Sequence, residues 1–154
     1  MVSIKRTQLI NAPVDRVWEI VSDTDNDQKY WSGLKSVSNV RKSDTVVERR
    51  VTVGFIGRDS LQIIKLNPKE SIKLTMKSGP LMGARDLKLI PSRNKKSTKV
   101  LVSWNFKFSA VPSFAHDFVR AQIESVTEEA LRKIAMTAEN SAVRKAIRSE
   151  VGAK

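Results

Sequence analysis

The pattern of apolar and polar residues changes three times along the chain, and each change marks a new kind of element. The segment 3–10 is short and mixes apolar with polar residues, which fits an opening strand. In the segment NAPVDRVWEIVSD that follows, apolar residues return every three to four positions: Val14, Val17, Trp18 and Val21. This spacing predicts a short amphipathic helix, with Pro13 in its first turn. We expect a second short helix or irregular turn to carry Tyr30 and Trp31.

From residue 34 to about residue 110 the period becomes two, as in half-buried strands. The clearest alternating segments, each bounded by turn-forming residues, are 45–53, 61–66, 72–77, 87–90 and 100–108. They predict a meander of five or six antiparallel strands with one apolar and one wet face. With the opening strand, the sheet is expected to have six to seven strands.

The last part of the chain predicts one long helix from Phe114 to about Asn140, with Ser113 as a candidate N-cap. About 27 helical residues span about 40 Å, enough to cross a small sheet. Residues 141–154 are basic and either extend this helix or form a frayed tail. We therefore predict a domain over residues 1–140 with a basic C-terminal extension over residues 141–154.

The order strand, helix, short helix, strand meander and long helix predicts a two-layer α+β fold. With 154 residues the chain fits one domain. It has no apolar run long enough for a membrane span and no recognisable secretory signal. The absence of cysteine excludes a disulfide, a thiolate nucleophile and a cysteine metal site. We expect a cytoplasmic protein without a metal or cofactor.

The formal net charge of +12 is concentrated in the middle of the chain. Residues 35–110 contain seventeen Lys and Arg against five Asp and Glu, whereas the segments on either side are nearly neutral. Such an excess is explained by solvated strand faces and turns. It is equally compatible with a surface that attracts an anionic membrane, a nucleic acid or an acidic partner.

Three features together resemble the START-like, or Bet v 1-like, superfamily of polyketide cyclases and lipid transport proteins. They are the opening INAPVDRVWEIVSD, the acidic turn leading to KYWSGLKSV, and the long helix after a strand that ends in WNFKF. The likeness covers roughly residues 3–138. It implies a helix-grip fold, in which a curved antiparallel sheet wraps around the long C-terminal helix and encloses an apolar cavity.

The resemblance implies a hydrophobic small-molecule ligand, such as a lipid, isoprenoid, quinone or polyketide, held by a carrier or sensor. We expect six residues to bind it: Tyr30, Trp31, Trp104, Phe106, Ile123 and Val126. Tyr30 and Trp31 join the helical step to the meander, and their mixed apolar and polar character suits a half-wet cavity rim. The simpler alternative is that these side chains fill a solid core.

An enzyme of the cyclase or dehydratase type is the first alternative, and it requires an ionisable group in the cavity. Glu48, Arg50 and Asp59 are candidates, but the register that decides their direction cannot be read from the sequence. His116 is expected to be a surface or capping residue, because a helix N-terminus disfavours its protonated form. No nucleophile elbow, phosphate loop, zinc spacing or dinucleotide motif is present.

A ribosome- or RNA-associated protein is the second alternative, because one START-like branch includes a ribosome-association toxin. The basic middle section fits this function. However, basic strands without aromatic residues for base stacking are a weak nucleic-acid signal. Docking on an anionic membrane surface explains the same charge.

Overall fold

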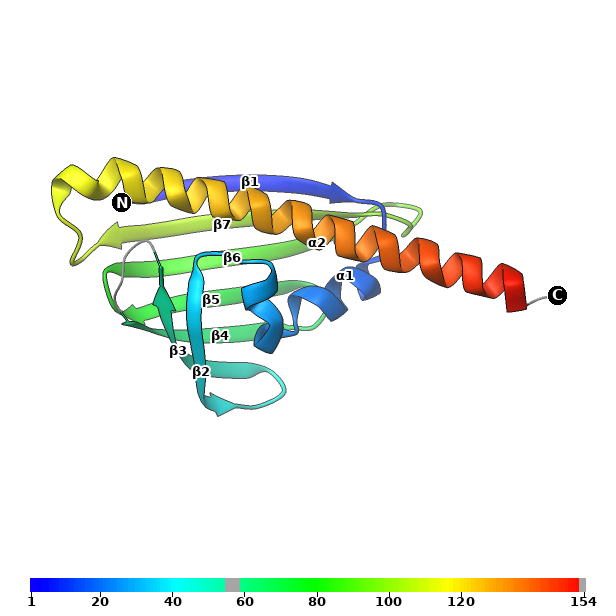
Figure 1. Ribbon diagram of the computed structural model, residues 1–154, viewed down its shortest axis with the longest axis horizontal. Helices are drawn as coiled ribbons and strands as arrows, with labels where there is room; N and C mark the ends of the chain where they lie inside the picture. Colours follow the sequence, from blue (N-terminus) through cyan, green and yellow to red (C-terminus); the bar gives the residue numbers. More distant parts are fainter. Residues whose placement is uncertain (55–58, 153–154) are drawn as a thin grey trace.

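In the computed structural model the chain forms a seven-stranded antiparallel sheet and a long C-terminal helix (Figure 1). The structure describes residues 1–54 and 59–152, and from residue 141 onward it describes the backbone alone. The strands are β1 (Val2–Ile10), β2 (Leu34–Lys42), β3 (Val46–Val53), β4 (Asp59–Asn67), β5 (Ser71–Ser78), β6 (Leu81–Pro91) and β7 (Thr98–Phe108). The helices are α1 (Val14–Val21), η1 (Thr24–Lys29), η2 (Ser113–Ala115) and α2 (His116–Gly152).

The strands follow one another across the sheet in the order β1-β7-β6-β5-β4-β3-β2, so only β1 is out of sequence. Each strand from β2 to β7 pairs with the next one, which is the predicted meander. The opening strand closes the other edge by pairing with β7. The predicted α+β helix-grip fold is confirmed.

Helix α2 packs against β1, β7 and α1 and crosses the sheet diagonally (Figure 1). On its exposed side, Arg6 of β1 donates hydrogen bonds to Glu124 and Glu128 of α2, both at 2.9 Å. One residue before the end of the predicted domain, Glu139 accepts a hydrogen bond from the backbone N–H of Asn11. These bonds fix the helix across the sheet, and the apolar core lies between the two layers.

The two ends of α2 differ from the prediction. A single turn of 3₁₀ helix, η2, precedes it, so Ser113 starts that turn and is not the N-cap of the long helix. At the other end the helix continues without a break past residue 140 to Gly152. The side chains of the basic extension, residues 141–154, lie outside the described residues. The sequence also predicts a turn or bulge at Gly54–Gly57, and three of these four residues lie outside the described residues. Within the part of the chain that is described, no helix has the length and hydropathy to span a membrane.

Part of the basic excess of the middle section lies on the outer face of the sheet. Lys65, Lys73, Lys88, Lys99 and Lys107 are all exposed there, in strands whose other face is buried. Lys65 of β4 and Lys73 of β5 are direct cross-strand partners. Like charges in this position destabilise a sheet.

Replacing Lys65 by Glu (K65E) is therefore expected to raise the free energy of unfolding by about 0.2–1 kcal/mol. Urea unfolding at low and high salt measures this gain, which should shrink as salt screens the pair. Lys99→Glu is the matched control, because the cross-strand partners of Lys99 are Leu9 and Ile90. An equal gain in the control would mean that net charge, not the Lys65–Lys73 pair, is responsible.

Candidate ligand site

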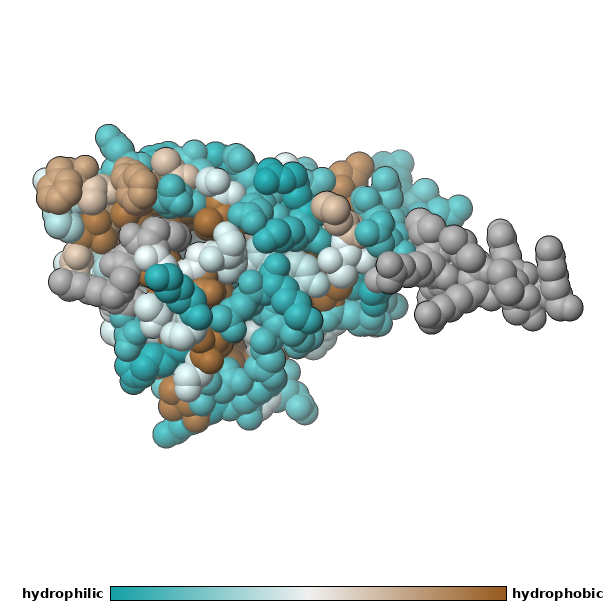
Figure 2. All heavy atoms as spheres, in the orientation of Figure 1, coloured by the Kyte–Doolittle hydropathy of each residue, from teal (hydrophilic) through white to brown (hydrophobic). Residues whose placement is uncertain are grey.

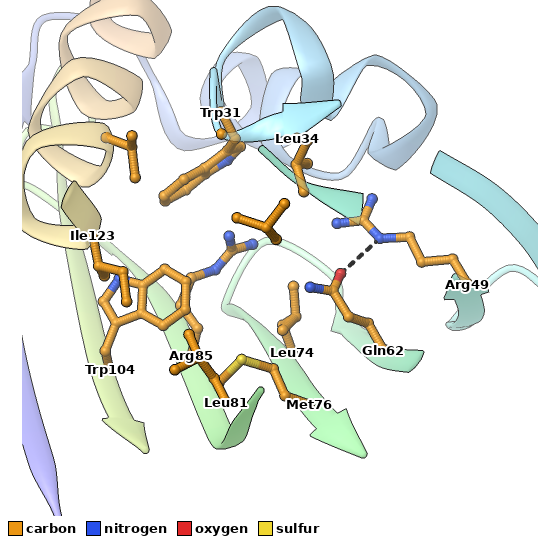
Figure 3. Close-up of a pocket in the computed structure, with 13 residues that line it drawn as sticks. Trp31, Leu34, Arg49, Gln62, Leu74, Met76, Leu81, Arg85, Trp104 and Ile123 are labelled. Carbon is orange, nitrogen blue, oxygen red and sulfur yellow. Dashed lines mark hydrogen bonds between the residues drawn. The ribbon is translucent and has the colours of Figure 1, made fainter. Parts of the chain in front are cut away.

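A cavity of about 60 Å³ lies between the sheet and α2 (Figure 3). Strands β3 to β7 form its floor, the first half of α2 forms one wall, and the segment after η1 covers it. Its apolar lining includes Trp31, Leu74, Met76, Leu81, Trp104 and Ile123. In this conformation the space accommodates a small chemical group or a few water molecules.

Trp31 closes the cavity on the side of the connector between η1 and β2. Its backbone N–H donates a hydrogen bond to the carbonyl of Asp27 at 2.8 Å, which fixes it at the end of the 3₁₀ helix. Its ring is 6 % exposed and meets the ring of Trp104 edge to face, with 6.3 Å between centroids. Trp104 is held in turn by α2, because its Nε1 donates to the hydroxyl of Thr127 at 3.0 Å. The two indoles thus join the connector, the sheet and the helix.

Arg85 of β6 is a buried cation at the centre of this aromatic group. It lies between Leu74 and Trp104 in the sheet, and its guanidinium carbon is 4.1 Å from the Trp31 ring centroid. The Trp104 ring centroid is 5.5 Å from the same carbon. No described residue accepts a hydrogen bond from its Nε. Burial lowers the pKa of Arg85 to about 10, so the group stays protonated at neutral pH.

Arg49 of β3 is the second buried cation, but it has partners. It donates hydrogen bonds to Gln62 at 3.0 Å, to the carbonyl of Thr24 at 3.3 Å and to Asp27 at 2.8 Å. Its side chain is 1 % exposed, and its Nη2 has no partner among the described residues. Burial raises the pKa of Asp27, while the positive charges of Arg49 and Arg85 oppose the rise.

The charges of this group do not balance. With Asp27 ionised, Arg49, Arg85 and Asp27 together carry +1; with Asp27 protonated they carry +2. Asp27 also lies behind Arg49, away from the cavity lining, where it bonds to Arg49 and not to Arg85. The cavity therefore presents an apolar surface with an unneutralised positive charge.

Four of the six residues predicted to bind a ligand line this cavity: Trp31, Trp104, Ile123 and Val126. Phe106 is fully buried behind Trp104, and their rings meet edge to face at 6.3 Å. Tyr30 is half-buried and packs against the core beside Trp31. Neither Phe106 nor Tyr30 is part of the described cavity lining.

The residues considered for catalysis lie elsewhere. Glu48 and Arg50 flank Arg49 on β3, so they point to the opposite face of the sheet. Asp59 is exposed and accepts a hydrogen bond from the Thr52 hydroxyl at 2.7 Å. His116 starts α2, where its Nε2 lies 2.8 Å from the Val111 carbonyl and its ring stacks on Phe108 at 3.9 Å. Through these contacts His116 anchors the loop that precedes the helix.

Arg49 and Arg85 are not among the residues predicted to form the site, although the sequence contains a signal for both. Arg49 alternates in phase with Val47, Val51 and Val53, and Arg85 alternates in phase with Leu87 and Leu89. A basic residue in phase with an apolar strand face is predicted to point inward. Glu48 and Arg50, the residues predicted as candidates, belong to the opposite face of the same strand.

The ionisable residues of the described cavity lining are of one type. Among the described residues that line the cavity, Arg49 and Arg85 are the ionisable ones, and neither is a general base at neutral pH. The described part of the chain also contains no cluster of three side chains able to hold a metal ion.

Comparison with solved structures supports the same fold. The Zhui aromatase/cyclase from a Streptomyces species is 16% identical, with a TM-score of 0.74, and the match covers 92% of this chain and 95% of that one. A protein from Thermus thermophilus has the same identity and TM-score, with 92% and 99% covered. A START superfamily protein from Mycobacterium smegmatis is 16% identical with a TM-score of 0.67, over 88% and 97% of the chains. No curated protein matches the sequence.

These structural likenesses show the fold alone, and a family match goes further. Residues 1–139 match the family described as polyketide cyclase/dehydrase and lipid transport. This range includes the whole sheet and every described residue of the cavity lining. The chain therefore belongs to the polyketide cyclase/dehydrase and lipid transport family.

Proposed function

We propose that this protein binds an apolar small molecule bearing one anionic group, and holds it as a carrier or sensor. The observation that carries the proposal is Arg85, a buried and protonated side chain that lines the cavity and has no acidic partner among the described lining residues. A carboxylate, phenolate, enolate or phosphate of the ligand would supply the missing negative charge. The indole rings and aliphatic side chains would contact its apolar part.

The energetics of buried charge support this assignment. An unpaired buried cation costs several kcal/mol of solvation, and contact with two indole rings returns about 1–2 kcal/mol. A side chain that lowers stability in the empty protein is typical of a functional site. Arg85 would recover the loss when an anion displaces any water beside it and accepts its hydrogen bonds.

The size of the cavity adds a condition. A ligand larger than a small group requires the cavity to widen, since drug-sized ligands occupy about 300–1,000 Å³. Met76 and Leu81 line the cavity and change rotamer readily compared with the indoles. We expect movement of such side chains, rather than of the sheet, to admit the ligand.

A pair of fluorescent probes with nearly the same ring system tests the charge requirement. Anilinonaphthalene sulfonate carries an anion, and N-phenyl-1-naphthylamine does not. We expect the native protein to prefer the sulfonate, and Arg85→Met to weaken sulfonate binding by about 10- to 100-fold, the equivalent of one charged hydrogen-bond pair. Fluorescence titration measures both affinities, and affinity for the neutral probe should hold or rise.

The control is Arg50→Met, which removes the same charge from the outer face of the sheet, where Arg50 is exposed. It should leave both affinities unchanged. Because Arg85→Met removes an unpaired buried charge, we expect it to fold at least as stably as the native protein. If the sulfonate binds Arg85→Met as tightly as it binds the native protein, the proposal that Arg85 binds an anionic group is wrong. If neither probe binds the native protein, the proposal that the cavity binds a ligand is wrong.

A cyclase or dehydratase remains the second candidate, and the position of Arg85 is the observation in its favour. A fixed guanidinium can stabilise an enolate that forms during cyclisation. The reaction also needs a group that moves a proton, and the described cavity lining offers none. To separate the two functions, the ligand is extracted from the purified protein, identified by mass spectrometry and incubated with the protein again. A carrier should release it unchanged, whereas an enzyme should convert it to a product. RNA or ribosome binding stays a prediction.

A further inference from the structure

A surface separate from the cavity presents two exposed phenylalanines at one end of the molecule. Phe114 of η2 is 89% exposed, and Phe118, four residues later in α2, is 57% exposed. Figure 2 shows apolar atoms gathered at this end of the long helix, beside the polar surface of the rest of that face. Isolated exposed aliphatic residues are normal, but two neighbouring exposed aromatic rings are typical of an interaction site.

The segment that carries these rings is held in place. The carbonyl of Pro80 accepts hydrogen bonds from the N–H groups of Ser109 and Ala110, at 2.8 and 3.3 Å. The Ser109 hydroxyl donates to the carbonyl of Gly79 at 2.6 Å. His116 adds its contacts to Val111 and Phe108. The turn before β6 and the loop before α2 thus form one unit, which we call the tip: residues 77–80 and 107–120.

The tip also carries a positive charge. Lys77 and Lys107 are each one residue from the end of their strands, β5 and β7, and both side chains are exposed. Arg120 contributes a third cation, although it also bonds to Glu124 at 3.0 Å. Asp117 is the one acidic residue within the tip. Exposed aromatic rings beside basic residues fit the interface of a bilayer, where rings enter the acyl boundary and cations contact anionic headgroups.

We propose that the tip docks on an anionic lipid bilayer, with Phe114 and Phe118 inserted at the headgroup level. The net charge of +12 attracts the protein to such a surface, and the rings then anchor it in one orientation. Leu81 directly follows the tip and Ile123 lies five residues past Phe118, and both line the cavity. Docking therefore places the near end of the cavity at the membrane. The proposal does not depend on the ligand bound there.

Vesicle co-sedimentation tests the docking surface. The probes are phosphatidylcholine vesicles and vesicles with about 30 mol % phosphatidylglycerol, a composition chosen for the assay. We expect binding to the anionic vesicles, weakened by salt, and a loss of roughly tenfold or more in Phe114→Ser/Phe118→Ser, from the apolar area removed. The matched control is Leu9→Ser/Ile90→Ser, since both residues are exposed and flank Lys99 at the start of β7. It should bind like the native protein.

A site-specific probe reports the orientation. The chain contains no cysteine, so Phe114→Cys and Ile90→Cys can each be labelled at one position with the environment-sensitive fluorophore NBD. We expect a blue shift on anionic vesicles at position 114 and none at position 90. Undiminished vesicle binding by the phenylalanine double variant overturns the proposal, as does equal loss in the control or an equal shift at both positions. Self-association that depends on Phe114 and Phe118, without vesicle binding, would instead assign the patch to a second copy.

Discussion

Replacing Arg49 by Met (R49M) is expected to lower the free energy of unfolding by about 3–5 kcal/mol at neutral pH, as removal of one partner from a buried ion pair does. Arg49 is 1 % exposed and satisfies Asp27, Gln62 and the Thr24 carbonyl at once. Methionine fills a similar volume but bonds to none of them. The loss is a large fraction of the roughly 5–15 kcal/mol that holds a typical domain together.

The loss should depend on pH in a defined direction. Burial raises the pKa of Asp27, and removal of Arg49 takes away an opposing positive charge. A carboxyl whose pKa is higher in the folded state binds its proton more tightly there. Its stabilising contribution is complete below the unfolded pKa, about 3.9, and is lost as pH rises through the higher folded value. The deficit of R49M should therefore be larger at pH 8 than at pH 5.

Urea unfolding at both pH values measures this effect, and Lys42→Met is the matched control. Lys42 of β2 pairs at 2.6 Å with Asp25, which lies on the same 3₁₀ helix as Asp27, but both side chains are about half exposed. Removing that surface pair should cost less than about 1 kcal/mol. Equal losses in the two variants would contradict the buried character of the Arg49–Asp27 pair.

Arg49 and Arg85 are expected to differ in their contribution to stability. Arg49→Met should destabilise the protein, whereas Arg85→Met should not, although the two residues are the same type and are both buried. The difference follows from their partners, because Arg49 donates to Gln62, the Thr24 carbonyl and Asp27, whereas no described residue accepts a hydrogen bond from Arg85 Nε. Loss of stability in both would indicate that Arg85 has a structural role.

Replacing Trp31 by Ala (W31A) is the second large effect, with an expected loss of about 3–5 kcal/mol from the cavity that remains. The indole is buried, meets Trp104 edge to face and covers the Arg85 guanidinium. Its removal opens Arg85 to solvent, so the pKa of Arg85 should move back toward the ordinary value. Binding of the sulfonate probe should weaken as well, since water then competes for the guanidinium.

Tyr30→Ala is the control for W31A, because the two aromatic residues are neighbours in sequence but differ in burial. Tyr30 is half-buried and only packs against the core, so its truncation should cost about 1–2 kcal/mol. Thermal and urea unfolding measure both variants. If the tyrosine variant lost as much stability and probe affinity as W31A, this would contradict the placement of Trp31, and not of Tyr30, in the cavity lining.

Much of the fold could be predicted from the order and period of the apolar residues. The period of two gave the meander, the i, i+3, i+4 spacing gave both helices, and the resemblance gave the helix-grip arrangement. Strand lengths were less accessible. β6 begins at Leu81, well before the alternation of Leu87 and Leu89 becomes evident, because Gly83 and Arg85 interrupt the apolar phase. β2 is mostly exposed and has almost no apolar face to mark it.

The residues of the candidate site could also be predicted only in part. Trp31, Trp104, Ile123 and Val126 could be predicted because large apolar residues on facing elements meet wherever those elements pack. Phe106 shares the strand face of Trp104 but lies beyond the cavity, and only the crossing of α2 over the sheet decides where the space ends. Periodicity cannot supply that crossing angle.

The sequence by itself determined the order of the main elements and which face of the alternating strands is apolar, because these depend on local periodicity. It also contained the two in-phase arginines, but not their meaning. Asp27 reaches Arg49 across 22 positions of chain, and no acidic residue in the described ranges bonds to Arg85 in the same way. Which buried charge is neutralised depends on distances between segments far apart in sequence. For that physical reason, only the tertiary structure separated the arginine that pairs with Asp27 from the one to which no described acidic residue bonds.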